Sequence, residues 1–218
     1  MRYMKMLGLA VVAALALTAL AGVGSASATT LCKKTVSPCP AGETYALGTV
    51  IEGHTSSVTL ETTEGLFNPV ITCATSTFSG KTTSVTASPT SLTGSIERLT
   101  FTGCIDSVAA GFCSTVVANL PLTAHITTAG ASSSGNGTLT LTGFEITFLC
   151  HAMGTSSFGV DHCRYKGEVV MGLTGGTPAS ALANNQTLTK SGGDFGCPNK
   201  ADWTAKYTIT KPSPLFVI

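Results

Sequence analysis

Eight cysteines, spread from Cys32 to Cys197, are the feature that most limits how this chain can fold. An even number of cysteines in an exported chain is typical of a disulfide framework. Zinc binding is the alternative use of cysteine, but the chain has no CxxC pair and its histidines do not stand at the spacing of a zinc finger. The sequence therefore predicts four disulfides, although eight cysteines allow roughly a hundred pairings.

The N-terminus predicts export. Arg2 and Lys5 form a basic start, and an apolar run without charge extends over residues 7–23. Ala26-Ser27-Ala28 then supplies small residues at the positions that a signal peptidase reads. The three features together are typical of a secretory signal peptide cleaved after Ala28. The alternative is a transmembrane anchor, which needs about 20 apolar residues, so this slightly shorter run favours cleavage.

We therefore expect a signal peptide at residues 1–28 and a single secreted domain at residues 29–218. Cleavage leaves 190 of the 218 residues and removes two basic but no acidic residues, so the net charge changes from +1 to −1. A nearly neutral domain has no electrostatic footprint for nucleic acid or anionic lipid. We expect the domain to act outside the cell or in the envelope, with no membrane span after cleavage and no nucleic-acid partner.

The secreted domain is predicted to consist of β-strands because apolar and polar residues alternate with a period of two, which is typical of half-buried strands. Threonine fits the exposed side of such strands well. Roughly a dozen short strands predict two packed sheets or a barrel, and we favour an antiparallel β-sandwich of immunoglobulin-like or jelly-roll character, stapled by disulfides. The clearest alternations lie at residues 57–61, 122–127, 138–142 and 201–210.

One disulfide is predicted from strand register. If Cys150 pairs with Cys163 across an antiparallel hairpin, Phe148 faces Tyr165 on the apolar side. A slip of one residue would turn one apolar set to solvent. The same register places Glu145 opposite Glu168, where like charges cost little in water.

The other disulfides are predicted with less support. A short turn between Cys104 and Cys113 predicts a second staple, and Cys32 and Cys39 bracket a loop that contains Pro38. Elimination then leaves Cys73 to reach Cys197, which would close the longest loop. The predicted pairs are Cys32–Cys39, Cys73–Cys197, Cys104–Cys113 and Cys150–Cys163.

No catalytic motif is present: the chain has no GxSxG elbow, HExxH pair, Walker loop or dinucleotide fingerprint. The predicted hairpin register places His151 opposite His162 near Met153 and Asp161, a set that resembles a weak copper or zinc site. Two exposed loop histidines are the simpler interpretation. We therefore expect no enzyme, no cofactor and no metal, with His151, His162 and Met153 as the only metal candidates.

Several runs resemble a group of uncharacterised exported proteins of soil actinobacteria. They include Leu99-Thr100-Phe101-Thr102-Gly103-Cys104, Gly135-Asn136-Gly137-Thr138-Leu139-Thr140 and Thr174-Gly175-Gly176-Thr177-Pro178-Ala179. The resemblance covers nearly the whole secreted domain. It implies export and a cysteine-containing β fold, and it brings no activity or site residues.

The leading functional prediction is a non-enzymatic structural or adhesive protein of the envelope or exterior, contacting a cell-surface polymer or a protein. A carbohydrate-binding module is the main alternative. Trp203, Tyr207 and Tyr165 fall on apolar faces, however, which favours core packing over a sugar platform. A secreted hydrolase or a metal-binding protein comes last.

Overall fold

The computed structural model describes residues 29–65, 68–85, 91–107, 111–129, 134–151 and 160–218. The predicted signal peptide and Met153 lie outside these residues. Within them the chain forms β1 (Leu31–Cys32), β2 (Val50–Thr55), β3 (Val58–Thr63), β4 (Val70–Val85), β5 (Ser91–Asp106), β6 (Phe112–Ala118), β7 (Leu122–Thr128), β8 (Gly137–His151), β9 (Val160–Thr174), β10 (Ala179–Gly193), β11 (Lys200–Lys211) and β12 (Phe216–Val217). No helix in this part of the chain is long and apolar enough to cross a membrane.

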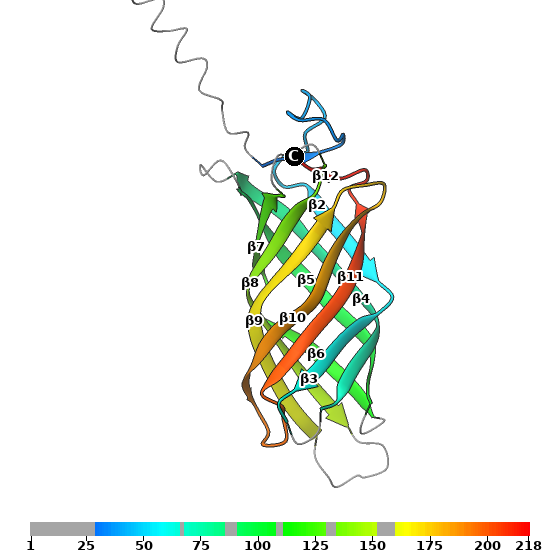
Figure 1. Cartoon of the computed structure of the whole chain (residues 1–218), viewed down its shortest axis with the longest axis vertical. Helices are drawn as coiled ribbons and strands as arrows, with labels where there is room; N and C mark the ends of the chain where they lie inside the picture. Colours follow the sequence, from blue (N-terminus) through cyan, green and yellow to red (C-terminus); the bar gives the residue numbers. More distant parts are fainter. Residues whose placement is uncertain (1–28, 66–67, 86–90, 108–110, 130–133, 152–159) are drawn as a thin grey trace, which may run out of the picture.

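The strands close into a barrel (Figure 1). β2 and β3 pair one after the other with both β4 and β11, so together they occupy one barrel position. β6 and β7 share another position between β5 and β8. Each position pairs antiparallel with the next one along the chain, and the pairing of β11 with β2 and β3 closes an eight-stranded circle. The all-β prediction is confirmed, but the predicted sandwich is not what forms, because no open edge separates two sheets.

The predicted alternation is confirmed on several strands. Trp203, Ala205, Tyr207 and Ile209 of β11 point into the barrel and are buried, while the residues between them face outward. The same holds for the apolar residues of β3, β7 and the first half of β8. Because one face of every barrel strand meets the interior, period two is retained around the whole circle.

A bulge at Gly143 explains why β8 changes its parity. Leu139 and Leu141 point inward before it, and Phe144 and Ile146 point inward after it. The pairing of β8 with β9 shifts between Leu141 and Phe144, and Gly143 has a φ of 71°. Glycine suits this left-handed position, which inserts one extra residue and turns the second half of the strand over.

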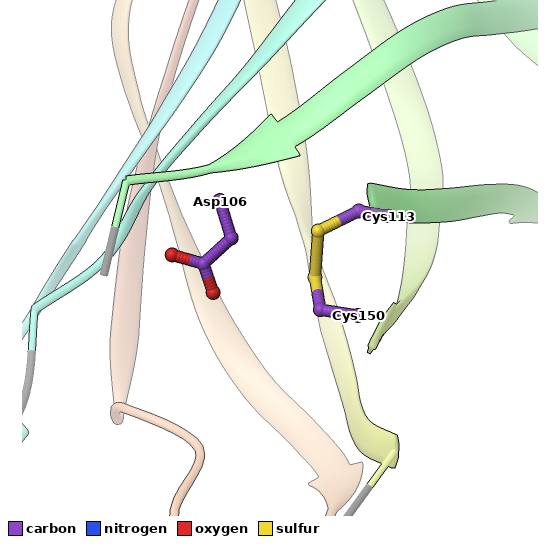
Figure 2. A group of neighbouring side chains, drawn as sticks. All are labelled: Asp106, Cys113 and Cys150. Atoms are coloured by element: carbon purple, nitrogen blue, oxygen red, sulfur yellow. A yellow bond between two sulfur atoms is a disulfide. The ribbon is translucent and has the colours of Figure 1, made fainter. Parts of the chain in front are cut away.

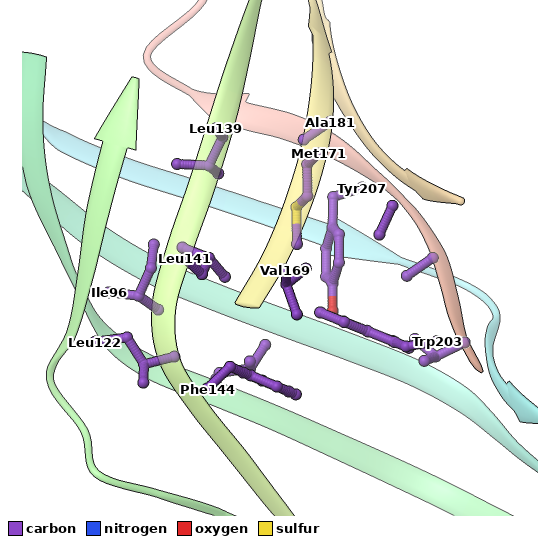
Figure 3. Close-up of a cluster of buried hydrophobic side chains, with 14 of the residues drawn as sticks. Ile96, Leu122, Leu139, Leu141, Phe144, Val169, Met171, Ala181, Trp203 and Tyr207 are labelled. Atoms are coloured by element: carbon purple, nitrogen blue, oxygen red, sulfur yellow. The ribbon is translucent and has the colours of Figure 1, made fainter. Parts of the chain in front are cut away.

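The lower half of the barrel is filled by aromatic side chains. Phe144 stacks on Trp203 with ring centroids 5.0 Å apart, and Phe101 meets the same indole edge-on at 6.4 Å. Phe78 meets Tyr207 edge-on at 5.3 Å, and the Tyr207 hydroxyl lies 2.9 Å from the buried Ser76 hydroxyl. Figure 3 labels Phe144, Trp203 and Tyr207 of this cluster and shows the two β11 residues opposite the aliphatic residues of β5, β7 and β8.

The four disulfides differ from the predicted set except at Cys32–Cys39, which is present. Cys73 is bonded to Cys104, Cys113 to Cys150, and Cys163 to Cys197. The predicted pairs Cys73–Cys197, Cys104–Cys113 and Cys150–Cys163 are therefore wrong. Two of these bonds join cysteines that lie opposite one another on neighbouring strands: Cys73–Cys104 joins β4 to β5, and Cys113–Cys150 joins β6 to β8.

The predicted hairpin register is wrong by two residues. Phe148 lies opposite Cys163, and Cys150 lies opposite Asp161. A slip of two keeps every side chain on its face, so the apolar pattern does not distinguish the two registers. The observed one places Glu145 opposite Lys166 instead of Glu168, and Arg164 Nε lies 3.2 Å from the Glu145 carboxylate. Opposite charges thus replace the like pair of the predicted register.

Candidate functional site

Of the three predicted metal candidates, the structure describes only the side chain of His162. The side chain of His151, like Met153, lies outside what the structure describes, and the backbone of His151 pairs with Val160 rather than with His162. The His162 amide donates to the Asp194 carboxylate at 2.7 Å, which fixes the loop before Cys197. His162 therefore lies in β9 beside the Cys163–Cys197 disulfide.

A different group of potential ligands lies at the lower end of the barrel (Figure 2). Asp106, Cys113 and Cys150 have side-chain atoms within 4.8 Å of one another, and all three residues are buried. The two sulfur atoms form a disulfide, however. Because the thiolate is the form of cysteine that binds metals, the oxidised cluster offers one carboxylate and no sulfur ligand.

A cavity of about 40 Å³ adjoins this cluster, and Asp106 and Tyr165 line it together with Thr62 and Pro198. Burial raises the pKa of Tyr165 to about 12, so its hydroxyl stays protonated at neutral pH. The Thr62 hydroxyl already donates to the Pro69 carbonyl at 2.8 Å. Among the described residues, the lining carries a carboxylate and a phenol but no histidine, lysine or free thiol to act with them.

The outer surface of the barrel carries a more extended candidate binding site. β5, β7 and β8 run side by side, and their outward residues align in three rows: Ser91 with Thr127 and Thr138, Thr93 with His125 and Thr140, and Ser95 with Thr123 and Thr142. Eight of these nine side chains carry a hydroxyl and the ninth is His125. We call these nine residues the hydroxyl face.

The geometry of the hydroxyl face follows from the sheet. Neighbouring strands lie about 4.8 Å apart, and outward residues repeat about every 6.7 Å along each strand. The side chains between them, such as Leu92, Ala124 and Leu139, are buried. The hydroxyls are therefore held at regular spacing by a packed interior, and no Asp, Glu, Lys or Arg stands among the nine positions.

Apolar side chains border the hydroxyl face on β9 and β10. Val170 lies opposite Thr140, and Gly172 lies opposite both Thr138 and Leu182. Val170 and Leu182 are 37 % and 43 % exposed. The Lys81–Glu97 ion pair borders the hydroxyl face on the other side, since Lys81 of β4 lies opposite Ser95, whereas the Lys200–Glu64 pair involves β11. The uncharged surface thus extends over five neighbouring strands.

Sequence reasoning identified the threonine alternation on single strands but not this face. The alternating runs at residues 122–127 and 138–142 were the part of the sequence pattern that indicated the hydroxyl face. Their alignment with residues 91–95 depends on strand pairing, which a single strand pattern does not specify.

Comparisons of the chain with protein-family models, with curated proteins and with solved structures gave no match.

Proposed function

We propose that the protein is a non-enzymatic structural or adhesive module that acts in the cell envelope or outside the cell, and that the hydroxyl face contacts a neutral cell-surface polymer. The observation that carries the proposal is the alignment of eight hydroxyl side chains and one imidazole on three paired strands, without a charge among them. The Thr93 oxygen is buried, so the other seven hydroxyls and His125 form the contact surface.

The chemistry of the face supports a hydroxyl-rich partner. Serine and threonine hydroxyls both donate and accept hydrogen bonds, so they match the hydroxyls of a polysaccharide. The bordering Val170 and Leu182 add apolar surface of the kind that sugar rings contact. Because the face carries no charge, binding through it should depend little on salt.

The stapled barrel supports a durable scaffold. Four disulfides within one domain are typical of proteins that work in an oxidising compartment. Rigid strands hold contact residues more accurately than loops do, which lowers the entropy lost on binding.

The alternative of a sugar site built on stacked aromatic residues has less support. Trp203, Tyr165 and Tyr207 are all buried in the barrel. A polymer would therefore be held by hydroxyls and methyl groups rather than by an aromatic platform.

The test is sedimentation of the purified disulfide-bonded protein with isolated envelopes of the producing organism. Thr123→Glu/Thr140→Glu places two carboxylates on the hydroxyl face and should weaken binding at least tenfold. Thr59→Glu/Thr208→Glu makes the same change on β3 and β11 and should bind as the unmodified protein does. Equal binding by the first variant, or no binding by the unmodified protein, would contradict the proposal.

A further inference from the structure

One aromatic side chain stands wholly in solvent at the lower end of the barrel. The turn between β10 and β11, residues 194–199, lies at that end in Figure 1 and contains Phe195. Phe195 is 97 % exposed, and the next most exposed large apolar side chain among the described residues, Leu47, is 55 % exposed. Burial of such a ring against a partner is favourable because it removes apolar surface from water.

The turn that carries Phe195 is braced. Cys197 is bonded to Cys163 of β9, and its N–H donates to the Asp194 carbonyl at 3.2 Å. Lys190 Nζ donates to the carbonyls of Asp194 and Cys197, at 2.7 and 3.1 Å. A ring held out in this way loses little conformational entropy when it binds, which distinguishes it from an ordinary exposed apolar residue.

An apolar pocket lies at the opposite end of the barrel. Residues 29–48 cover the upper end in Figure 1, and a pocket of about 210 Å³ lies between them and the barrel wall. Leu31, Tyr45, Leu47 and Leu92 line it, and the lining is almost wholly apolar. Because Leu47 is exposed, the pocket reaches the surface. We call it the upper pocket.

The upper pocket is large enough for a phenyl ring. An apolar cavity of about 150 Å³ is known to admit benzene, and the upper pocket exceeds that volume. An almost wholly apolar lining offers little to a polar or charged occupant, which would lose its hydrogen bonds to water on entering. An aromatic side chain such as that of Phe195 therefore fits both the size and the chemistry of the pocket.

Charges beside the exposed ring and beside the upper pocket are complementary. Asp194 precedes the exposed ring in the chain and is itself exposed. Lys33 lies over the ring of Tyr45, a lining residue, at 5.7 Å, while the neighbouring Lys34 is paired with Glu43 at 2.8 Å. Opposite charges thus accompany ring and pocket. The net charge of +1 for the whole chain gives little repulsion between copies.

We propose that copies of this chain associate head to tail, with Phe195 of one copy in the upper pocket of the next. Ring and pocket lie at opposite ends of the barrel, so each contact leaves one ring and one pocket unused. Repetition of the contact then gives an open chain of copies rather than a closed dimer. The contact uses the barrel ends, so it does not depend on the hydroxyl face and goes beyond the function proposed above.

Each contact is weak. One aromatic side chain buries about 150–250 Å², whereas stable complexes bury about 1,200 Å² or more. The chains of copies therefore form where the protein is concentrated, as on a surface.

The test is sedimentation equilibrium of the purified disulfide-bonded protein at concentrations up to about 1 mM, the range in which weak contacts form. The average mass should rise with concentration beyond that of a dimer. Phe195→Ser removes the ring, and Leu47→Asp places a carboxylate at the mouth of the pocket. Each should weaken association at least tenfold. Leu182→Ser removes an exposed apolar side chain from the barrel wall and should associate as the unmodified protein does.

A mixing experiment tests the head-to-tail arrangement. Phe195→Ser retains the pocket, and Leu47→Asp retains the ring. Each variant alone should stay monomeric, whereas their equimolar mixture should form dimers and nothing larger, because one complementary pair of ends remains. A contact between two like ends would not be restored by mixing.

Salt tests the paired charges. Association of the unmodified protein should weaken about threefold between low salt and about 1 M salt, because salt screens Asp194 from Lys33. Lys33→Ala should lose this dependence, and a variant that keeps it would overturn the placement of Asp194 beside Lys33.

Four results would overturn head-to-tail association. The first is unchanged association of Phe195→Ser, and the second is a mass that stops rising at the dimer. The third is a mixture of the two variants that stays monomeric. The fourth is an unmodified protein that stays monomeric with native disulfides and Trp203 emission; binding of that monomer to phosphatidylcholine vesicles through Phe195 would then assign the ring to a lipid surface.

Discussion

Cys104 and Cys113 lie directly opposite one another on β5 and β6 with both side chains buried, yet each is bonded to the cysteine on its other side. Cys73, Cys104, Cys113 and Cys150 thus form one row across four neighbouring strands. Cross-strand geometry permits a disulfide between any two neighbouring cysteines of this row. Bonding the first to the second and the third to the fourth leaves no cysteine unpaired. A middle bond would leave two cysteines that are three strands apart.

We predict that the middle pair forms when its competitors are removed. In Cys73→Ser/Cys150→Ser, Cys104 and Cys113 should become bonded, because opposite cysteines on paired strands are within disulfide range. Mass mapping of peptides under non-reducing conditions measures this bond.

The matched control is Cys73→Ser/Cys113→Ser. It leaves Cys104 and Cys150 two strand spacings apart, about 9.6 Å, which exceeds the reach of a disulfide. Both should remain free thiols. A bond in this control, or free thiols in the first variant, would show that the row is not held as described.

The row also shows which part of the fold was predictable. Burial of Phe148, Cys150 and Tyr165 on one side follows from alternation, and the structure agrees. Disulfide partners depend instead on which strands are neighbours. Cys150 has β9 on one side and β6 on the other, and only the second neighbour offers an opposite cysteine.

Barrel closure was not predictable for a similar reason. It depends on β11 pairing with β2 and β3, and Trp203 lies opposite Leu60 across that seam. Alternating strands look alike whether the sheet closes or splits into two, because both arrangements bury one face of each strand. The hydroxyl face was missed together with closure, since its three strands align only within the barrel.

We predict that replacing each of two buried tyrosines by phenylalanine changes the free energy of unfolding in opposite directions. The Tyr165 hydroxyl has no hydrogen-bond partner among the described residues, whereas the Tyr207 hydroxyl is 2.9 Å from the Ser76 hydroxyl. Tyr165→Phe removes an unpaired buried polar group and should raise the free energy of unfolding by about 1 kcal/mol. Tyr207→Phe leaves Ser76 unpaired and should lower it by about 1–2 kcal/mol.

Urea unfolding of the two variants measures this difference. Equal effects would mean that the two hydroxyls have equivalent surroundings, contrary to the structure.

The same tyrosines predict loss of stability in alkali. Burial raises the pKa of Tyr165 to about 12 and raises that of Tyr207 as well, from an ordinary value of about 10. Between those values the unfolded chain loses protons that the folded chain keeps, so stability falls as pH rises. The contribution of the two tyrosines to the free energy of unfolding is fully present below about pH 10. Above that pH each tyrosine lowers the free energy of unfolding by up to about 1.4 kcal/mol per pH unit.

Urea midpoints at pH 9, 10 and 11 test this dependence. Tyr207→Phe should show a shallower decline than the unmodified protein, because one titrating group is gone. An unchanged slope in that variant would assign the decline to other groups.

The stacked pair of Phe144 and Trp203 gives the last prediction. Their ring planes are 1° apart, and Trp203 is the only tryptophan of the chain, so tryptophan emission reports on the surroundings of this one indole. Phe144→Leu keeps an apolar side chain but removes the stacked ring and leaves space beside the indole. It should lower the free energy of unfolding by about 1–3 kcal/mol and shift the emission of the folded protein. Ile126→Val, in the upper barrel, should cost about 0.5–1.5 kcal/mol without an emission shift. If both variants shift the emission equally, the indole responds to general loosening of the barrel, and Phe144 has no special part in holding it.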